Sequence, residues 1–265
     1  IVLVGKQKEF KTGGIGYTSL RGRLTELFEG QIIFLIKNFF RLLVLVHKYD
    51  CLLVVGDVVP ILGAWLTKLP VIVYLVAYSS HYEGQLRLPW PSKFCLSSKR
   101  FIGIYCRDNL TSDDLTRQLN KPVFFLGNPF MDQVLKPTTK LPSFSQRLAI
   151  LPGSRRPELD NNLSLLLKVV SYFPAENYQL SIDMALVGSL DNFRLKNLAN
   201  SLGWHFLSSN GQGPDQLLLM NHKINIYRDS FVEVLQASDI VLAMAGTASE
   251  QAVGLGKPVV QFPGD

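Results

Sequence analysis

The chain has 265 residues, 47% of them hydrophobic and 18% charged, which excludes a disordered or low-complexity protein. Lys and Arg number 27 against 21 Asp and Glu, giving a formal net charge of +6. This excess is too diffuse to indicate nucleic-acid binding, and it suits a polyanionic small ligand or an acidic membrane surface. The three cysteines, Cys51, Cys95 and Cys106, show neither a disulfide framework nor zinc spacing, which favours a reducing compartment. No bound metal is therefore expected.

The first long apolar segment is 32–46, which Lys37, Asn38 and Arg41 interrupt. No uncharged apolar stretch reaches the roughly 18 residues of a membrane span. The polar positions recur at helical spacing and leave a wide apolar face. Two interpretations stay open: a buried core helix, or a basic amphipathic helix that lies on a membrane surface.

From residue 50 onward, strand-like and helix-like segments alternate. In the first half we expect strands at 50–56, 70–76, 101–105 and 122–126, and helices at 57–68 and 111–119, with Asp113 and Asp114 in the first turn of the latter. Residues 136–146, rich in Pro, Thr, Ser and Lys, predict a linker. In the second half we expect strands at 147–151, 180–187, 204–207, 224–227, 239–243 and 258–261, and helices at 157–172, 190–202, 231–237 and 247–255. Such alternation predicts an α/β protein with two Rossmann-like, doubly wound domains, 1–135 and 147–265, facing a cleft. The chain starts at Ile1 and stops just after an apolar run, so we expect both domains to be incomplete.

Ligands of doubly wound sheets bind beyond the carboxyl ends of the strands, so the residues that follow each strand are candidates. After strand 147–151 come Gly153, Ser154 and Arg155. Glycine allows a close backbone approach, the hydroxyl and guanidinium can bind phosphate oxygens, and the next helix presents its N-terminus. A solvated turn with a surface arginine pair is the alternative.

A second such turn follows strand 239–243 and carries small and hydroxyl residues, then an acid: Gly246, Thr247, Ala248, Ser249, Glu250 and Gln251. Its helix N-terminus can bind an anion, and Glu250 can accept hydrogen bonds from a ribose diol. The alternative is an ordinary capped helix, in which the Glu250 carboxylate in the first turn interacts favourably with the helix dipole. In the first half, Asp57 directly follows a strand and is either a general base or a helix N-cap. His81 also follows a strand and is a further position to test.

Four segments of the chain resemble lipid-A-disaccharide synthases. Residues 151–155 followed by Glu158 resemble that family's LPGSR-x-x-E motif, and 245–250 resemble its SGTATLE helix start. Residues 126–132 resemble its GHP-x-x-D segment, and 55–57 resemble a strand-end Gly-x-Asp. Asn128 replaces the family's histidine, and the acid comes one residue early, so Glu250 or Gln251 corresponds to the family's glutamate. The chain is therefore similar to a divergent relative of these enzymes.

The resemblance implies the two-domain glycosyltransferase B-type fold and sugar transfer from a UDP-sugar with inversion, without a cofactor or an obligatory metal. By the same resemblance, Gly153, Ser154, Arg155 and residues 246–251 would bind the nucleotide sugar. Asp57 would be the acceptor-side acid or base, and Gly127, Asn128 and Pro129 would lie where the two domains join. It further implies an N-acylglucosamine-type sugar, a lipid-linked or amphipathic acceptor, and a cytoplasmic protein in peripheral contact with the inner membrane through 32–46.

Two alternatives share the fold. A UDP-N-acetylglucosamine 2-epimerase would need further acids and a histidine around the sugar, and the sequence shows no such cluster. A non-catalytic nucleotide-sugar-binding protein would bind UDP without turnover.

Overall fold

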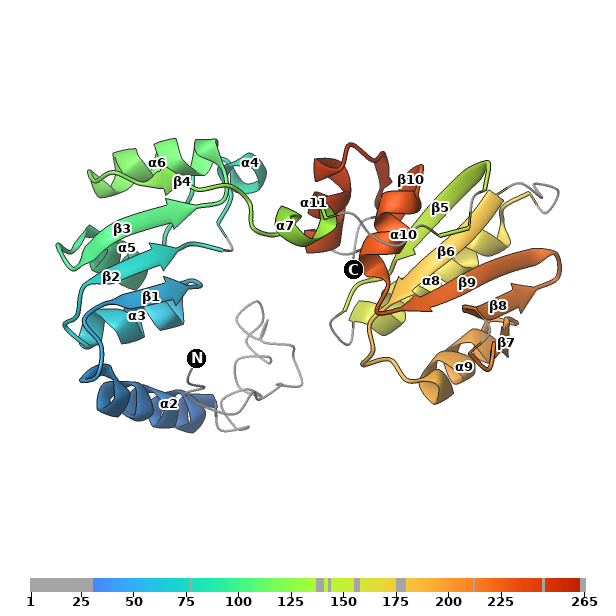
Figure 1. Ribbon diagram of the computed structural model, residues 1–265, viewed down its shortest axis with the longest axis horizontal. Helices are drawn as coiled ribbons and strands as arrows, with labels where there is room; N and C mark the ends of the chain where they lie inside the picture. Colours follow the sequence, from blue (N-terminus) through green and yellow to red (C-terminus); the bar gives the residue numbers. More distant parts are fainter. Residues whose placement is uncertain are drawn as a thin grey trace. The chain divides into compact units, whose positions relative to one another are not determined.

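The computed structural model describes residues 31–262, apart from 77, 137–140, 143, 155–157, 175–179, 212 and 245 (Figure 1). The described residues form two compact units, and the chain passes from the first to the second between Pro129 and Phe130. This boundary precedes the linker expected at 136–146. Residues 130–136 belong with the second unit because the Gln236 side-chain amide donates to the carbonyl oxygens of Val134 and Lys136, at 2.7 and 2.6 Å.

The first unit is built on a parallel sheet of four strands in the order β1-β2-β3-β4. The strands are β1 (Leu52–Val55), β2 (Val71–Tyr74), β3 (Phe101–Cys106) and β4 (Phe124–Phe125). The helices are α2 (Gln31–Val46), α3 (Val58–Leu66), α4 (Ser80–Glu83), α5 (Trp90–Ser97) and α6 (Asn109–Leu119). The expected strands and helices of this half are confirmed; β1, β2 and β4 are shorter than expected, and β3 extends one residue further, to Cys106. The described strands succeed one another across the sheet in chain order.

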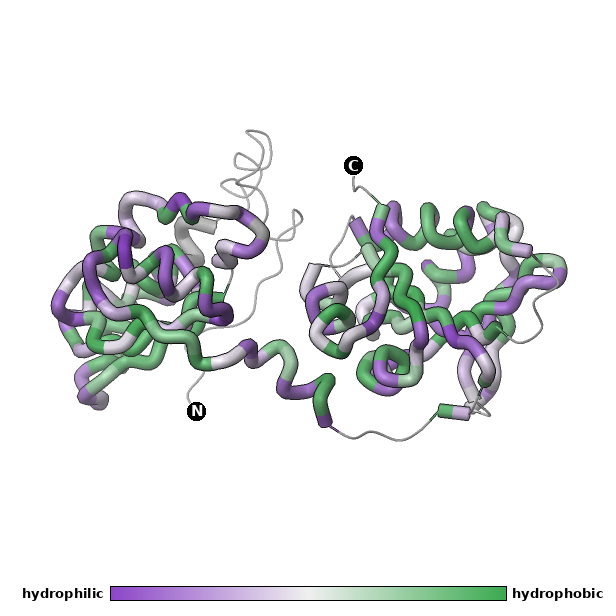
Figure 2. The backbone as a smooth tube through the Cα atoms, turned by 90° about the horizontal axis from the view of Figure 1, so that it is seen from above, coloured by the Kyte–Doolittle hydropathy of each residue, from purple (hydrophilic) through white to green (hydrophobic). Residues whose placement is uncertain are grey.

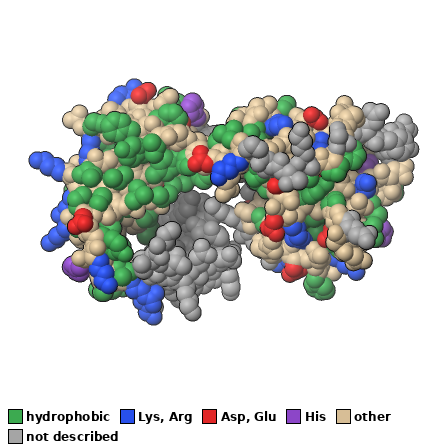
Figure 3. Space-filling model, in the orientation of Figure 1, with side chains coloured by type: hydrophobic (Ala, Val, Ile, Leu, Met, Phe, Trp, Pro, Cys, Tyr) green, Lys and Arg blue, Asp and Glu red, His purple; other side chains and the backbone are tan. Residues whose placement is uncertain are grey.

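One face of this sheet packs against α3, α5 and α6 around a core that includes Val73, Phe101 and Ile104. Alternate residues point to the opposite face. There Leu53 and Val55 are 72% and 64% exposed in the described structure. Figure 3 shows hydrophobic side chains gathered over this part of the molecule.

α6 corrects a sequence prediction, because it begins at Asn109, earlier than expected. Asp108 is its N-cap, and the Thr111 N–H donates to the Asp108 carboxylate at 2.7 Å. Asp113 and Asp114 therefore lie beyond the first turn. Asp114 is buried and accepts from the Leu86 N–H at 2.7 Å, so it fixes the loop after α4 instead of favouring the helix dipole.

α4 and α5 were not expected from the sequence. Pro91 occupies the first turn of α5, where a missing N–H costs nothing.

The second unit contains a sheet of seven strands in the order β11-β10-β5-β6-β9-β8-β7. The strands are β5 (Gln146–Leu151), β6 (Leu180–Leu186), β7 (His205–Leu207), β8 (Asp215–Leu219), β9 (His222–Arg228), β10 (Ile240–Ala243) and β11 (Val259–Val260). The helices are α7 (Met131–Val134), α8 (Glu158–Ser171), α9 (Asn192–Ser201), α10 (Phe231–Ala237) and α11 (Gly246–Gly254). α8 and α9 cover one face, and α7, α10 and α11 cover the other. The central strands β5 and β6 are buried on both faces. Figure 2 shows long hydrophobic stretches of the chain in this unit.

The edge of this sheet differs from the prediction of wholly parallel strands. β8 pairs antiparallel with both β7 and β9, and the sequence analysis missed β8. The hairpin between β8 and β9 turns at Met220, whose φ of +50° is unusual for a residue with a side chain. A tight antiparallel hairpin needs no crossover helix, so the alternation rule could not detect it.

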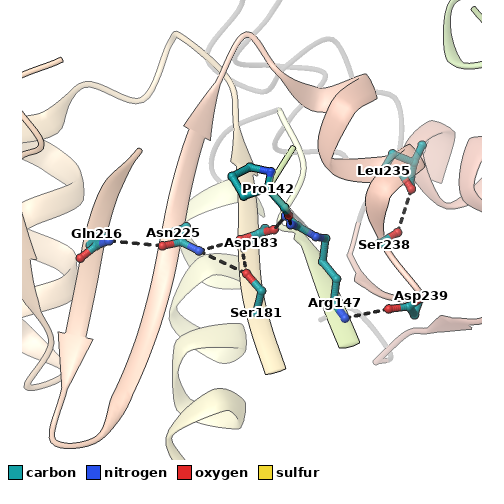
Figure 4. A network of polar contacts seen from close by, with 9 residues as sticks. All are labelled: Pro142, Arg147, Ser181, Asp183, Gln216, Asn225, Leu235, Ser238 and Asp239. Carbon is teal, nitrogen blue, oxygen red and sulfur yellow. Dashed lines mark hydrogen bonds and ion pairs between the residues drawn. The ribbon is translucent and has the colours of Figure 1, made fainter. Parts of the chain in front are cut away.

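A buried polar network crosses the sheet from β5 through β6 to the middle of β9 (Figure 4). The Arg147 guanidinium forms an ion pair with Asp183, whose side chain is fully buried. Asp183 also accepts from the Ser181 hydroxyl at 2.9 Å and from the Asn225 amide at 2.8 Å. Arg147 donates to the Pro142 carbonyl as well, which ties the segment before β5 to the second unit.

Candidate functional site

The second sheet reverses its winding direction next to β5. From β5 the chain adds β6 and then β9 on one side, and it later returns to add β10 and β11 on the other. The loops after β5 and β10 therefore lead to helices on opposite faces of the sheet. In open α/β sheets a crevice opens at such a switch point, and ligands bind there. The candidate site is thus the position where the loops after Leu151 and Ala243 begin.

The structure brings two predicted motifs together at this switch point. The Met244 N–H donates to the Leu151 carbonyl oxygen at 2.9 Å, so the two loops start side by side. Gly153 then adopts a φ of +104°, a conformation that favours glycine. Ser154 is exposed at this turn. Arg155 lies outside the described residues, so its predicted role is carried by the sequence alone.

α11 supplies the other side of the site. Gly246 and Thr247 are exposed in its first turn, where helical N–H groups lack intrahelical partners and attract anions. Ala248 packs against the core beneath. Glu250 is half-buried one turn further on. Gly246, Thr247 and Glu250 thus remain suited to bind a nucleotide sugar, which stays a prediction.

Ser249 and Gln251, also predicted as ligands, are engaged inside the unit. The Ser249 side chain is buried, and its hydroxyl accepts from the Gln261 amide at 2.8 Å. The Gln251 amide donates to the Phe130 carbonyl oxygen at 2.6 Å. The Gln251 contact holds the start of the second unit against α11, and the Ser249 contact ties α11 to the segment after β11. The choice between Glu250 and Gln251 as the ribose ligand stays a prediction.

In the first unit, Asp57 follows β1 and occupies the N-cap position of α3. Its side chain makes no capping hydrogen bond to that helix. Asp57 thus has the position of a helix cap but not the hydrogen bond that a cap provides. Burial raises the pKa of the Tyr78 phenol, and the nearby Asp57 carboxylate raises it further. The acid or base role of Asp57 remains a prediction.

Sequence reasoning missed a second carboxylate at the same edge of this sheet. Asp108 follows β3 and accepts from the Thr111 hydroxyl at 2.8 Å and from the Ser79 hydroxyl at 3.0 Å. The exposed His81 imidazole lies 3.9 Å from its other oxygen. The signal was present, since an aspartate that follows a predicted strand within three residues and precedes a threonine by three is typical of an N-cap.

Gly127, Asn128 and Pro129 lie at the end of the first unit. Gly127 has a φ of +102°, and its carbonyl oxygen accepts from the Tyr74 hydroxyl at 3.2 Å. The chain passes from the first unit to the second directly after Pro129, and the role of these residues at a domain junction stays a prediction. Any contact of these residues with a ligand stays a prediction.

Across the described ranges, no group of three His, Cys, Asp or Glu side chains could hold a metal ion. The cysteines of this part are free thiols: Cys51 is exposed, and Cys95 and Cys106 are buried. Burial raises the pKa of Cys106 from 9.0 to about 11.

Comparison with known proteins was made by sequence and by structure. No family model matches the chain. The chain is 22% identical over 146 residues to lipid-A-disaccharide synthase 1 of Legionella pneumophila (strain Paris), an alignment of 52% of this chain and 33% of that protein. The chain therefore spans about a third of the length of the curated relatives it matches.

Two solved structures share its architecture. A UDP-GlcNAc 2-epimerase from Methanocaldococcus jannaschii aligns with a TM-score of 0.50 and 18% identity over 85% of this chain and 66% of its own. A putative UDP-N-acetylglucosamine 2-epimerase from Listeria monocytogenes aligns with a TM-score of 0.53 and 16% identity over 86% and 62%. The chain has the glycosyltransferase B-type fold. The expected α/β, Rossmann-like fold is confirmed.

Proposed function

We propose that this chain belongs to an inverting glycosyltransferase, which moves a sugar of the N-acylglucosamine type from a UDP-sugar to a lipid-linked or amphipathic acceptor. The observation that carries the proposal is the pairing of the two loops after β5 and β10 at the switch point of the second sheet. Each loop leads into a helix. The sequence similarity to a lipid-A-disaccharide synthase supports the sugar-transfer chemistry.

The proposed chemistry follows from the groups at the switch point. Transfer breaks the bond between the sugar's anomeric carbon and the diphosphate, and negative charge builds on the departing UDP. The N-termini of α8 and α11, the hydroxyls of Ser154 and Thr247, and Arg155 are donors suited to stabilise that charge. Glu250 accepts hydrogen bonds from the ribose hydroxyls. Asp57 takes the proton of the acceptor hydroxyl while the oxygen of that hydroxyl bonds to the anomeric carbon, on the face opposite the departing UDP.

Calorimetric titration of the protein with UDP tests the proposal. We expect Arg155→Ala and Glu250→Ala each to weaken binding by about 10- to 100-fold, because a hydrogen bond to a charged group contributes about 1.5–3 kcal/mol. Asp113→Asn removes an exposed carboxylate from α6 in the first unit and should leave the affinity unchanged. A wild-type protein that binds neither UDP nor another nucleoside diphosphate would contradict the proposal.

An epimerase is the second candidate, because the solved structures described above are UDP-GlcNAc 2-epimerases. The histidines described in the second unit do not support an epimerase site there. His222 starts β9 and His205 starts β7, which runs parallel to β9, so both lie at the sheet edge opposite the switch point. Incubation with UDP-GlcNAc, followed by proton NMR, should show no C2 epimer. Tight UDP binding without transfer to any of a broad acceptor panel would instead favour the non-catalytic alternative.

The proposed membrane contact is carried by α2. Ile36, Phe40 and Val44, on successive turns of this helix, are 49%, 61% and 72% exposed, and Lys37 and Arg41 beside them are exposed as well. An apolar stripe flanked by basic residues suits the surface of an anionic bilayer. No helix within the described segments is long and apolar enough to cross a membrane.

Sedimentation with vesicles that contain phosphatidylglycerol tests this contact. Phe40→Ser combined with Val44→Ser should reduce the bound fraction at least about tenfold, because two large apolar side chains no longer enter the bilayer. Phe193→Ser removes a similarly exposed phenylalanine, 76% accessible, from α9 and serves as the control. Equal binding by wild type and both variants would contradict the assignment.

A further inference from the structure

Asn162, in the second turn of α8, bridges the two loops of the switch point. Its side-chain Nδ2 donates to the Pro152 carbonyl oxygen at 2.9 Å and to the Met244 carbonyl oxygen at 3.3 Å. One loop follows β5 and the other follows β10, so a single amide group contacts both. The side chain is partly buried.

This bridge lies where the sheet itself can no longer hold the two loops together. The ladder between β5 and β10 reaches the bond from the Met244 N–H to the Leu151 oxygen. Pro152 has no N–H to donate, and Gly153 turns away with its positive φ. A carbonyl oxygen in a partly buried place needs a donor, and the Asn162 amide has two hydrogens for two such oxygens.

We infer that Asn162 is a positioning residue for the nucleoside diphosphate. Its two amide hydrogens bond to the loops and do not contact the ligand. By fixing the spacing of the loops, it aims the N–H groups and hydroxyls around Ser154 and Thr247 at one anion. Preorganised donors of this kind need no rearrangement when charge arrives, so the bridge contributes to affinity through both loops at once. The inference rests on the proposed function for the identity of the ligand, and on the printed contacts alone for the spacing of the loops.

Asn162→Asp is the sharpest substitution, because it keeps the shape of the side chain and replaces both donor hydrogens by an acceptor that repels the two carbonyl oxygens. Asn161→Asp is the matched control: it places the same charge one residue away, on an exposed position of the same helix. Asn162→Ala shows the effect of losing the bridge without adding a charge. Urea titration first establishes that all three variants remain folded.

Two measurements then follow: hydrogen exchange of the Met244 amide, whose bond to the Leu151 oxygen joins the two loops, and calorimetric titration with UDP. We expect the Met244 amide to exchange about five- to tenfold faster in both Asn162 variants and UDP to bind at least about tenfold more weakly, with Asp worse than Ala and Asn161→Asp close to wild type. Unchanged exchange in the Asn162 variants, or equal effects of Asn161→Asp, would overturn the inference. If the wild-type protein does not bind UDP, the proposed function fails, and the exchange result alone decides whether Asn162 positions the loops.

Discussion

Replacing Asp183 by alanine should strongly destabilise the second unit. Asp183 is fully buried and forms an ion pair with Arg147, which is also almost inaccessible. It further accepts hydrogen bonds from Ser181 and Asn225. Its removal leaves a buried guanidinium without a counter-charge, an arrangement that costs about 3–5 kcal/mol. That loss is a large share of the roughly 5–15 kcal/mol that stabilises a typical domain.

Removing both charges should have a different result. In Arg147→Met combined with Asp183→Leu, the desolvation cost of both ions disappears together with their attraction. Such exchanges are often neutral or stabilising by about 1–4 kcal/mol. Here Asn225 and the Pro142 carbonyl lose partners, so we expect a net change of less than about 2 kcal/mol.

Urea titration followed by tryptophan fluorescence measures these changes in the second unit alone. Trp204 is fully buried in that unit, whereas Trp65 and Trp90 belong to the first. A background with Trp65→Phe and Trp90→Phe makes Trp204 the only reporter. Asp132→Ala removes an exposed carboxylate of α7 in the second unit, serves as the control and should cost about 0.5 kcal/mol or less. If Asp183→Ala costs no more than Asp132→Ala, or if the double replacement is the more damaging, the reasoning from a buried ion pair is refuted.

Three further predictions concern the first unit. Burial raises the pKa of Cys106 to about 11, whereas the unfolded thiol ionises near 9.0. The free energy of unfolding should therefore fall by on the order of 2 kcal/mol as the pH rises from about 9 to about 11. Urea titrations across this pH range should show a smaller fall for Cys106→Ala. The exposed Cys51 should react with a thiol reagent at pH 8 much faster than Cys106, as mass spectrometry of the native protein can show. Asp114→Ala leaves the Leu86 N–H without its acceptor, at a cost of about 1–3 kcal/mol, and should speed tryptic cleavage at the exposed Arg87; unchanged cleavage would contradict the assigned contact.

Sequence patterns were sufficient for most of the architecture. The runs at 147–151 and 180–187 predict strands, and the helix that starts near Pro157 carries a proline at its beginning. These signals are local, so they survive without knowledge of the fold. The rule that ligands lie after the strands also selected the two loops that the structure pairs.

Strand order and side-chain partners were decided only by the tertiary structure. The antiparallel hairpin of β8 and β9 and the buried state of Ser249 depend on residues that pack from elsewhere in the chain. Asn162 shows the same limit: in the sequence it is one of two adjacent asparagines on a helix, and nothing local distinguishes them. Its two acceptors lie 10 and 82 residues away, so only the folded chain could show that it joins both loops. The sequence thus determined which segments form strands and helices and where a ligand would be sought, because those depend on local periodicity and turn chemistry. The fold decided which side chains meet there, because contacts between distant residues carry no local signal.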